Sequence, residues 1–375
     1  MRVVHLITGL GVGGTETALL RLLRQLDRRV VQSTVVSMTG GGVMADRIRA
    51  AGIPVDDLGM RRGLPNPLAV GRLHARLRRE RPDILQTWLY HADLLGMVSG
   101  SLARVPAIAW NIRCSSMDER YVRGLNGLTV RLLARCSGLP AAIVSNSKVG
   151  IHYHQGLGYR ARRWAMIPNG FDVDAFRPDQ SARRDVRAEL GLDAGAALIG
   201  LVARYDPVKD HRTFLRAAAQ LAPRQPDAHF VLVGAGIDRN NAQLAPLAND
   251  PALAGRLHML GERSDVPRLT AALDVATCAS TSEGFPNIVG EAMACGVPVV
   301  TTDVGAARLV VGATGSVVPA ADPTALAAGW GELLALDASQ RIALGSAARD
   351  RIVQEYSIAA TAAQYADLYR SLRAA

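Results

Sequence analysis

Two glutamates, Glu283 and Glu291, stand eight positions apart around a short turn that contains glycine and proline. The turn, Gly284 to Asn287, follows an apolar run, and a helix predicted over 288–295 ends at Gly296. Free N–H groups at the start of a helix attract phosphate. Carboxylates on either side of that start can accept hydrogen bonds from sugar hydroxyls. The segment therefore suits a nucleoside diphosphate joined to a sugar.

Two cations, Arg204 and Lys209, follow the first apolar run of the second half of the chain and stand five positions apart. On one loop they can converge on a diphosphate, because fixed cations stabilise the negative charge that a departing diphosphate gains. The other lysine of the chain is Lys148, against 41 arginines, which favours a specific use of Lys209. Ordinary surface cations are the alternative.

The spacing of Glu283 and Glu291 within Glu-Gly-Phe-Pro-Asn resembles the signature of retaining glycosyltransferases of family 4. Three further segments match in the order that this family has: Gly13 to Glu16, Ile167 to Asp172, and Arg204 with Lys209. The resemblance covers nearly the whole chain and implies the α/β GT-B fold, with two doubly wound Rossmann-like domains that face a central cleft. A solvated helix face is the alternative for the glutamate pair.

The resemblance implies a role for each of these residues. Glu283 would orient the donor sugar, Glu291 would hold the ribose hydroxyls, and Arg204 and Lys209 would hold the diphosphate. A backbone segment would share the diphosphate, and it consists of Phe285, Pro286, Asn287 and Ile288. No side chain stands as a covalent nucleophile. The family's usual mechanism is attack on the same face, in which a donor phosphate oxygen helps to deprotonate the acceptor.

The expected activity is transfer of a sugar, a hexose, from a UDP- or GDP-sugar with retention at the anomeric carbon. The nearest alternatives are a GT-B sugar phosphorylase and a nucleotide-sugar epimerase, which phosphate use or an acceptor-free product would reveal. A sugar-nucleotide binding module without turnover is a more distant alternative. No cofactor is expected.

The glycines after the first predicted strand suggest a rival class. Gly9, Gly11 and Gly14 satisfy G-x-G-x-x-G, the pattern of dinucleotide-binding oxidoreductases. That fold needs an acidic residue about 20 positions on, at the end of the second strand. Here that strand ends at Val36 to Gly40 without a carboxylate. As the resemblance implies, Gly13 and Gly14 then form a loop that lets the donor diphosphate approach, with a plain strand-to-helix turn as the alternative.

A metal site is not expected. Asp172 and Asp174 spell the D-x-D pattern of metal-dependent sugar transferases, but they lie in a segment that resembles the family's interdomain linker. With Arg204, Lys209 and helix amides to hold a diphosphate, a divalent cation has no evident role.

The residues expected to contact the acceptor or the sugar depart from the family pattern. Many members carry a histidine after a middle strand of the first domain, where this chain has Asn111 and Arg113 as substitutes. Trp88 and Tyr90 follow the preceding strand and offer faces on which a sugar can stack. His91 is either a ligand of a sugar hydroxyl or a helix-start residue.

Short apolar runs alternate with longer amphipathic runs, the pattern of a parallel sheet covered by helices. Strands are predicted at 3–7, 33–37, 83–86, 107–110, 142–145, 198–202, 230–233, 275–278 and 299–301. We expect an acceptor-side domain over 1–172 and a donor domain over 173–355. The remainder, 356–375, contains a helix from about 358 to 372 that by resemblance crosses back onto the first domain.

Composition indicates a large cytoplasmic enzyme. The 375 residues are 49% hydrophobic, yet no run approaches the ~18 uninterrupted apolar residues of a membrane helix. Met1 to Leu10 lacks the layout of a signal peptide. The four cysteines fit neither zinc nor redox spacing, so we expect reduced thiols.

Charge is divided unequally along the chain. Residues 1–172 carry 24 basic and 11 acidic side chains, a net charge of +13, whereas 173–375 carry 19 and 22, a net charge of −3. Amphipathic segments bear many of these arginines, at 121–135 and at Arg72, Arg76, Arg78, Arg79 and Arg81. Near an anionic leaflet each contributes ~1 kcal/mol. We expect a lipid-linked or envelope-polysaccharide acceptor at the inner face of the cytoplasmic membrane, with no nucleic-acid partner. Compositional arginine of a GC-rich genome is the alternative.

Overall fold

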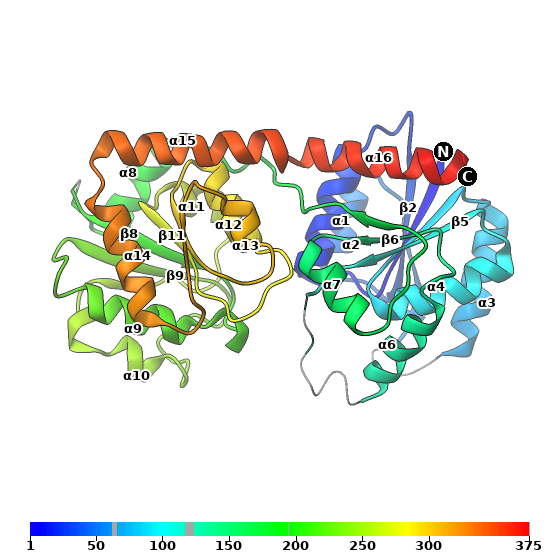
Figure 1. The fold of residues 1–375 in the computed structure, drawn as a ribbon, viewed down its shortest axis with the longest axis horizontal. Helices are drawn as coiled ribbons and strands as arrows, with labels where there is room; N and C mark the ends of the chain where they lie inside the picture. Colours follow the sequence, from blue (N-terminus) through cyan, green and yellow to red (C-terminus); the bar gives the residue numbers. More distant parts are fainter. Residues whose placement is uncertain (62–65, 116, 118–123, 194, 375) are drawn as a thin grey trace. The chain divides into compact units, whose positions relative to one another are not determined.

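The computed structural model describes residues 1–375 except 62–65, 116, 118–123, 194 and 375. The chain divides into two compact units (Figure 1). The first unit consists of Met1–Gly170 and Ile358–Ala375, and the second consists of Phe171–Ser357. Each unit has its own parallel sheet and its own core.

The first unit is built on a seven-stranded sheet in the order β3-β2-β1-β4-β5-β6-β7. Its strands are β1 (Arg2–Ile7), β2 (Gln32–Thr39), β3 (Val55–Met60), β4 (Ile84–Trp88), β5 (Ala107–Ile112), β6 (Ala142–Ser145) and β7 (Trp164–Met166). Its helices are α1 (Gly14–Gln25), α2 (Val43–Ala50), α3 (Pro67–Glu80), α4 (Tyr90–Ala103), α6 (Leu125–Cys136), α7 (Lys148–Gly156) and α16 (Ile358–Ala374). Each neighbouring pair of these strands is parallel, so the carboxyl ends of the strands share one edge.

Helices cover both faces of this sheet because side chains of a strand point alternately to its two sides. In β1, Val3 and Ile7 pack in one core with α1, α2 and α16, whereas Val4 and Leu6 pack in another with α3, α4 and α6. The last helix thus lies in the first unit, and Figure 1 shows it in red beside α1. Tyr365 is one of its residues in this core.

The second unit has a six-stranded parallel sheet in the order β10-β9-β8-β11-β12-β13. Its strands are β8 (Ala197–Val202), β9 (Ala228–Val233), β10 (Leu257–Met259), β11 (Val275–Cys278), β12 (Val299–Thr302) and β13 (Ser316–Val318). Its α-helices are α8 (Gln180–Glu189), α9 (His211–Leu221), α10 (Ala245–Ala248), α11 (Val266–Ala271), α12 (Asn287–Ala294), α13 (Ala307–Val311), α14 (Pro323–Ala335) and α15 (Ala338–Glu355). Short 3₁₀ helices are η1 (Pro207–Lys209) and η2 (Pro251–Leu253).

Both sheets are doubly wound, and each has a point where the order of the strands reverses. In the first unit the reversal lies between β1 and β4, and in the second it lies between β8 and β11. Loops that leave two such neighbouring strands diverge to opposite sides of the sheet, which leaves room for a ligand at their carboxyl ends. The candidate residues follow these strands.

The predicted α/β architecture of two doubly wound parallel sheets is confirmed, and every predicted strand is present. The sequence analysis missed β3, β7, β10 and β13. Three of these strands have only three residues, and β3 exposes Asp56 and Asp57 at the edge of its sheet. Among the described residues, no helix combines the length and the apolar character needed to cross a bilayer.

Candidate functional site

The second unit brings together two of the predicted catalytic residues. Nζ of Lys209 lies 2.5 Å from Oε1 of Glu283, and Oγ of Ser280 donates a hydrogen bond of 2.7 Å to the same oxygen. The Glu283 side chain is 12% exposed and that of Lys209 is 27% exposed. The carboxylate is therefore oriented by two neighbours at a position that solvent still reaches. The sequence analysis did not identify Ser280.

Two adjacent strands position this pair. Lys209 ends η1 after β8, and Glu283 follows β11, which is the neighbour of β8 in the sheet. The two loops are joined where the backbone N–H of Thr281 donates to the carbonyl of Val208 at 2.8 Å. Asp206 fixes the start of η1 by accepting a hydrogen bond from the N–H of Val208 at 3.1 Å. The local backbone thus holds Lys209 next to Glu283.

Arg204 is more exposed than Lys209 and has its own carboxylate partner. Its side chain is 60% exposed, and its Nη2 lies 3.2 Å from Oδ2 of Asp206. Each of the two predicted diphosphate ligands is therefore paired with a carboxylate of the protein. An exposed pair of this kind is worth little in stability, so Arg204 can exchange its partner at small cost.

Helix α12 begins directly after the glutamate turn, as the sequence predicted. Phe285 is buried, and its ring lies 6.0 Å from that of Phe171 and 6.1 Å from that of Tyr356. Gly290 allows close packing, because a Cβ there would lie 2.1 Å from Cζ of Phe171. The turn is thus anchored by an aromatic side chain and leads into a helix whose second turn carries Glu291, which is half-buried.

The remaining donor-binding candidates also lie at this helix start. Pro286 is the N-cap of α12, where no side chain caps the helix, and Asn287 is its first residue. Ile288 is half-buried and packs against the core of the second unit. Uncapped N–H groups at such a position can bind an anion.

In the first unit, the glycine loop leads from β1 into α1. Gly13 is the N-cap of α1 and Gly14 is its first residue. Gly13 is half-buried and Gly14 is exposed, and the nearest atoms to a Cβ on Gly13 would belong to the flexible carboxylate end of Glu16. The second strand ends at Thr39, without the carboxylate that a dinucleotide-binding site of the oxidoreductase type uses.

The prediction that Trp88 and Tyr90 offer stacking faces for a sugar is wrong. Trp88 is completely buried, and its ring stacks on Tyr365 of α16 with centroids 6.2 Å apart. Tyr90 is also buried, and its hydroxyl lies 2.7 Å from Nε2 of His154. The last helix and α7 cover these rings, which local sequence could not reveal.

Of the other acceptor candidates, only two are brought together. Asn111 is buried in β5 and donates through Nδ2 to the hydroxyl of Tyr365 at 2.8 Å. Arg113 follows β5, and its Cζ lies 5.1 Å from the centroid of the Trp88 ring. His91 is the second residue of α4 and is half-buried, as a helix-start residue is.

The D-x-D segment caps a turn. Oδ1 of Asp172 accepts hydrogen bonds from the N–H groups of Asp174 at 3.3 Å and Ala175 at 2.9 Å. Within the described part of the chain, no group of three or more His, Cys, Asp or Glu side chains could hold a metal ion.

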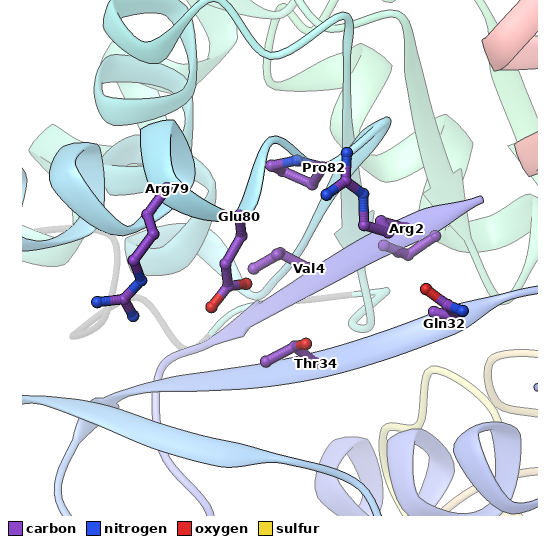
Figure 2. Close-up of a pocket in the computed structure, with 8 residues that line it drawn as sticks. Arg2, Val4, Gln32, Thr34, Arg79, Glu80 and Pro82 are labelled. Carbon is purple, nitrogen blue, oxygen red and sulfur yellow. The ribbon is translucent and has the colours of Figure 1, made fainter.

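A pocket of about 250 Å³ lies in the first unit, far along the strands from these residues. Figure 2 shows Arg2, Gln32, Thr34 and Glu80 around it, at the first residues of β1 and β2 and the last residue of α3. Ligands of doubly wound sheets bind at the carboxyl ends of the strands. This pocket is at the opposite ends, so it is not the site of the predicted chemistry.

The chain has two doubly wound units, and charged side chains of the second unit lie at the carboxyl ends of its strands, beside the reversal of strand order. This arrangement is that of the GT-B class of proteins. The family described as Glycosyltransferase Family 4 matches residues 12–175, and Glycosyl transferases group 1 matches residues 196–335. The chain belongs to the glycosyltransferases that these two models describe, one for each part of the chain, and it has the GT-B fold.

Relatives and solved structures agree with this assignment. A D-inositol 3-phosphate glycosyltransferase of Corynebacterium urealyticum is 34% identical over 58% of this chain and 53% of its own length. A UDP-Gal:alpha-D-GlcNAc-diphosphoundecaprenol alpha-1,3-galactosyltransferase of Escherichia coli is 27% identical over 62% of this chain and 60% of its own. The match thus spans little more than half the length of these relatives. Anabaena Alr3699/HepE in complex with UDP has a TM-score of 0.87 at 23% identity, covering 99% of this chain and 100% of that one.

Proposed function

We propose that the protein is a retaining glycosyltransferase that transfers a hexose from a UDP- or GDP-sugar to a lipid-linked or envelope-polysaccharide acceptor. The observation that carries the proposal is the contact of Lys209 with Glu283 at the junction of β8 and β11. An ammonium and a carboxylate that lie side by side can bind the two parts of a sugar nucleotide. The ammonium can donate hydrogen bonds to the diphosphate, and the carboxylate can accept hydrogen bonds from the sugar hydroxyls.

The donor class is supported by the proteins that this chain resembles. HepE was crystallised with UDP and with UDP-glucose, and the Escherichia coli relative is named for UDP-Gal. Glu291, eight positions after Glu283 and in the second turn of α12, is proposed to hold the ribose hydroxyls, and the start of α12 is proposed to hold the diphosphate. Gly13 and Gly14, at the start of α1, are proposed as donor-binding residues of the first unit.

Retention is proposed because the glutamate signature resembles that of retaining glycosyltransferases, and Glu283 is proposed to orient the donor sugar. Its Oε1 is held by Lys209 and Ser280, which suits a carboxylate that orients a sugar by accepting hydrogen bonds. In the proposed reaction the acceptor hydroxyl attacks the anomeric carbon on the face that the diphosphate leaves, and its proton passes to a donor phosphate oxygen. Arg204 and Lys209 stabilise the departing nucleoside diphosphate.

The first unit is proposed to dock on an anionic membrane, but with fewer arginines than the sequence suggested. Nη1 of Arg72 donates to the carbonyl of Leu58 at 3.0 Å. Arg76 contacts Asp56, and its Nη2 lies 2.7 Å from Oε1 of Glu80. These two arginines hold α3 against β3, so they are not free to bind lipid.

The cations that remain are exposed and have neither a hydrogen-bond partner nor an ion-pair partner among the described residues. They are Arg78, Arg79 and Arg81 at the end of α3, and Arg131 and Arg135 of α6. The adjacent helices α4 and α6 expose apolar side chains, namely Val98, Leu102, Leu128 and Leu132. Exposed apolar groups beside cations suit the interface of an anionic bilayer. Arg123, a further arginine of the predicted amphipathic segment 121–135, lies outside the described residues.

Donor screening followed by product analysis tests the proposal. The full chain is incubated with UDP- and GDP-sugars, and the rise in melting temperature selects the donor. The anomeric configuration of the transferred sugar is then read by NMR from its proton coupling constant. We expect the configuration of the donor to be kept. An inverted product contradicts retention, a product that requires inorganic phosphate indicates a phosphorylase, and an altered donor without acceptor indicates an epimerase.

A further inference from the structure

The first unit holds a half-buried guanidinium that no carboxylate of the described residues neutralises. Arg113 directly follows β5, at the edge of the sheet where doubly wound folds bind ligands. Its Nη1 is shielded from solvent and has no hydrogen-bond partner among the described residues. Burial lowers the pKa of Arg113, and of the described residues only Tyr365 opposes that effect.

Aromatic side chains hold Arg113 in place. Its Cζ lies 5.1 Å from the centroid of the Trp88 ring, and Trp88 stacks on Tyr365 at an interplanar angle of 27°. The hydroxyl of Tyr365 is fixed by Nδ2 of Asn111 at 2.8 Å. Burial raises the pKa of Tyr365, so the phenol is neutral and supplies no counter-charge. The guanidinium is thus oriented by stacking, and no carboxylate of the described residues compensates its charge.

Native proteins leave few buried polar atoms without a partner, and a buried charge is costly unless it is paired. Evolution retains such an arrangement most readily where a ligand supplies the missing partner. The planar guanidinium matches the oxygens of a phosphate or carboxylate group. Because Arg113 as a whole is only half-buried, part of it remains in reach of solvent.

Asn111, two positions before Arg113, supports this arrangement from within the core. It is completely buried, so it is not expected to contact a ligand directly. Its amide instead fixes the hydroxyl of Tyr365, which stacks on Trp88, and the guanidinium of Arg113 lies over the Trp88 ring. The part of Arg113 that solvent reaches is therefore presented on a rigid base.

We propose that Arg113 binds a phosphate group of the acceptor, and that Asn111 positions the aromatic side chains that hold the guanidinium. The proposal rests on the proposed transferase function and names the substrate class: an acceptor that carries a phosphate group. Such a phosphate can belong to a soluble sugar phosphate or to the headgroup of a lipid carrier. Arg113 is then a specificity-determining residue and not a catalytic one.

Phosphate binding to the full chain tests this role. Inorganic phosphate is titrated calorimetrically at constant ionic strength against protein saturated with UDP, with chloride as the reference anion. Arg113→Gln should weaken phosphate binding about 10-fold or more, the effect of losing a charged hydrogen bond. Arg162→Gln, an exposed arginine of the same unit, is the matched control and should bind like the wild type. Equal affinities of Arg113→Gln and wild type would overturn the proposal.

Two further measurements keep the test decisive if Arg113→Gln does not fold. Arg113→Lys keeps the charge and loses the planar fork, so its affinity should fall between those of wild type and Arg113→Gln. Wild-type binding of glucose 1-phosphate should also weaken below pH about 6, where a phosphate monoester loses its second charge. Wild-type protein that binds phosphate no better than chloride contradicts the proposal.

Two additional probes separate the sources of the phosphate. Glucose 1-phosphate represents a soluble acceptor, and phosphatidylcholine vesicles with phosphatidic acid represent a lipid headgroup. Whichever probe loses affinity in Arg113→Gln, and not in Arg162→Gln, identifies the source, and loss with neither overturns the proposal. The phosphate titration is repeated without UDP. Failure to bind UDP then contradicts the proposed transferase, while the comparison of Arg113 variants still decides this inference.

Discussion

Lys209 and Glu283 are 74 residues apart in the chain, yet Nζ of the lysine lies 2.5 Å from Oε1 of the glutamate. They meet because β8 and β11 are neighbours in the sheet and their loops are joined by the hydrogen bond from Thr281 to Val208. The contact links the residue proposed to hold the diphosphate with the residue proposed to orient the sugar. Substitution of either residue should therefore alter the position and the electrostatic environment of the other side chain.

Glu283→Ala should lower kcat by ~10²–10³-fold, because the orienting carboxylate acts in the transition state. UDP affinity should survive, since the proposed nucleotide contacts lie elsewhere. Turnover of the donor is measured by release of nucleoside diphosphate, and UDP affinity by calorimetry. Glu332→Ala, an exposed glutamate of α14, is the control. Near-normal turnover in Glu283→Ala would remove the residue from the mechanism.

Lys209→Ala should cost about 2 to 4 kcal/mol of transition-state stabilisation, the range for one strong electrostatic donor. Lys148, the other lysine of the chain, is exposed at the start of α7 and provides a matched substitution. The value is obtained from the ratio of kcat/KM for mutant and wild type. Equal kcat/KM for the two lysine variants would contradict the assignment.

Activity should persist in EDTA, and Asp174→Ala should be nearly as active as the wild type. The reason is that Oδ1 of Asp172 accepts hydrogen bonds from two N–H groups of the turn. Lys209 and Arg204 are the cations proposed to bind the diphosphate in place of a metal ion. Initial rates with EDTA and with added Mn²⁺ or Mg²⁺ provide the check. A strict need for either ion would return Asp172 and Asp174 to consideration as ligands.

Stability should fall as the pH drops from about 6.5 toward 4. Burial lowers the pKa of His154 in the first unit and of His211 in the second to about 4 from 6.5. In this window the unfolded chain binds protons that the folded chain does not, so the free energy of unfolding decreases with falling pH. The stabilisation from each neutral histidine is present above pH about 6.5, and its loss amounts to ~3 kcal/mol at most.

Urea unfolding at pH 7 and pH 5 measures this effect. His154→Gln should be less stable at pH 7 but should show a smaller loss of stability between the two pH values. His152→Gln changes an exposed residue of the same helix and should keep the wild-type difference. An unchanged pH dependence in His154→Gln would contradict the prediction.

Changing Arg78, Arg79 and Arg81 together to Gln should weaken binding to anionic vesicles. The interaction is screened by salt, with a Debye length of ~8 Å at physiological ionic strength, so wild-type binding should also fall as salt rises. Vesicle sedimentation measures both effects. A triple change of exposed arginines in the second unit, Arg184, Arg212 and Arg216, removes the same charge as a control. Protein that ignores anionic vesicles at low salt would favour a soluble acceptor.

Arg72 and Arg76 should behave differently from that exposed set. Because Arg76 binds Asp56 and Glu80 and Arg72 binds the carbonyl of Leu58, their replacement should lower the melting temperature before it affects lipid binding. Differential scanning calorimetry separates the two effects. Unchanged melting in Arg72→Gln and Arg76→Gln would show that these contacts do not support α3.

The strands and the glutamate turn were predictable because their causes are local. Apolar runs such as 275–278 are long enough to mark a strand buried on both faces, and Gly296, with φ of 70°, ends α12 as glycine does after a helix. Strands of three residues, such as Trp164–Met166, carry too short a pattern to be recognised. Their pairing with a neighbouring strand defines them.

The sequence by itself determined the fold class, the family and the candidate residues Glu283 and Lys209, but not Ser280, because apolar periodicity and motif spacing are properties of neighbouring residues. The tertiary structure alone decided which of those residues meet and which are covered. Packing of α16 buries Trp88 and places Tyr365 beside Asn111, and strand order brings Lys209 to Glu283. These contacts join residues far apart in the chain, and burial depends on the elements that pack over a side chain and not on its neighbours in sequence.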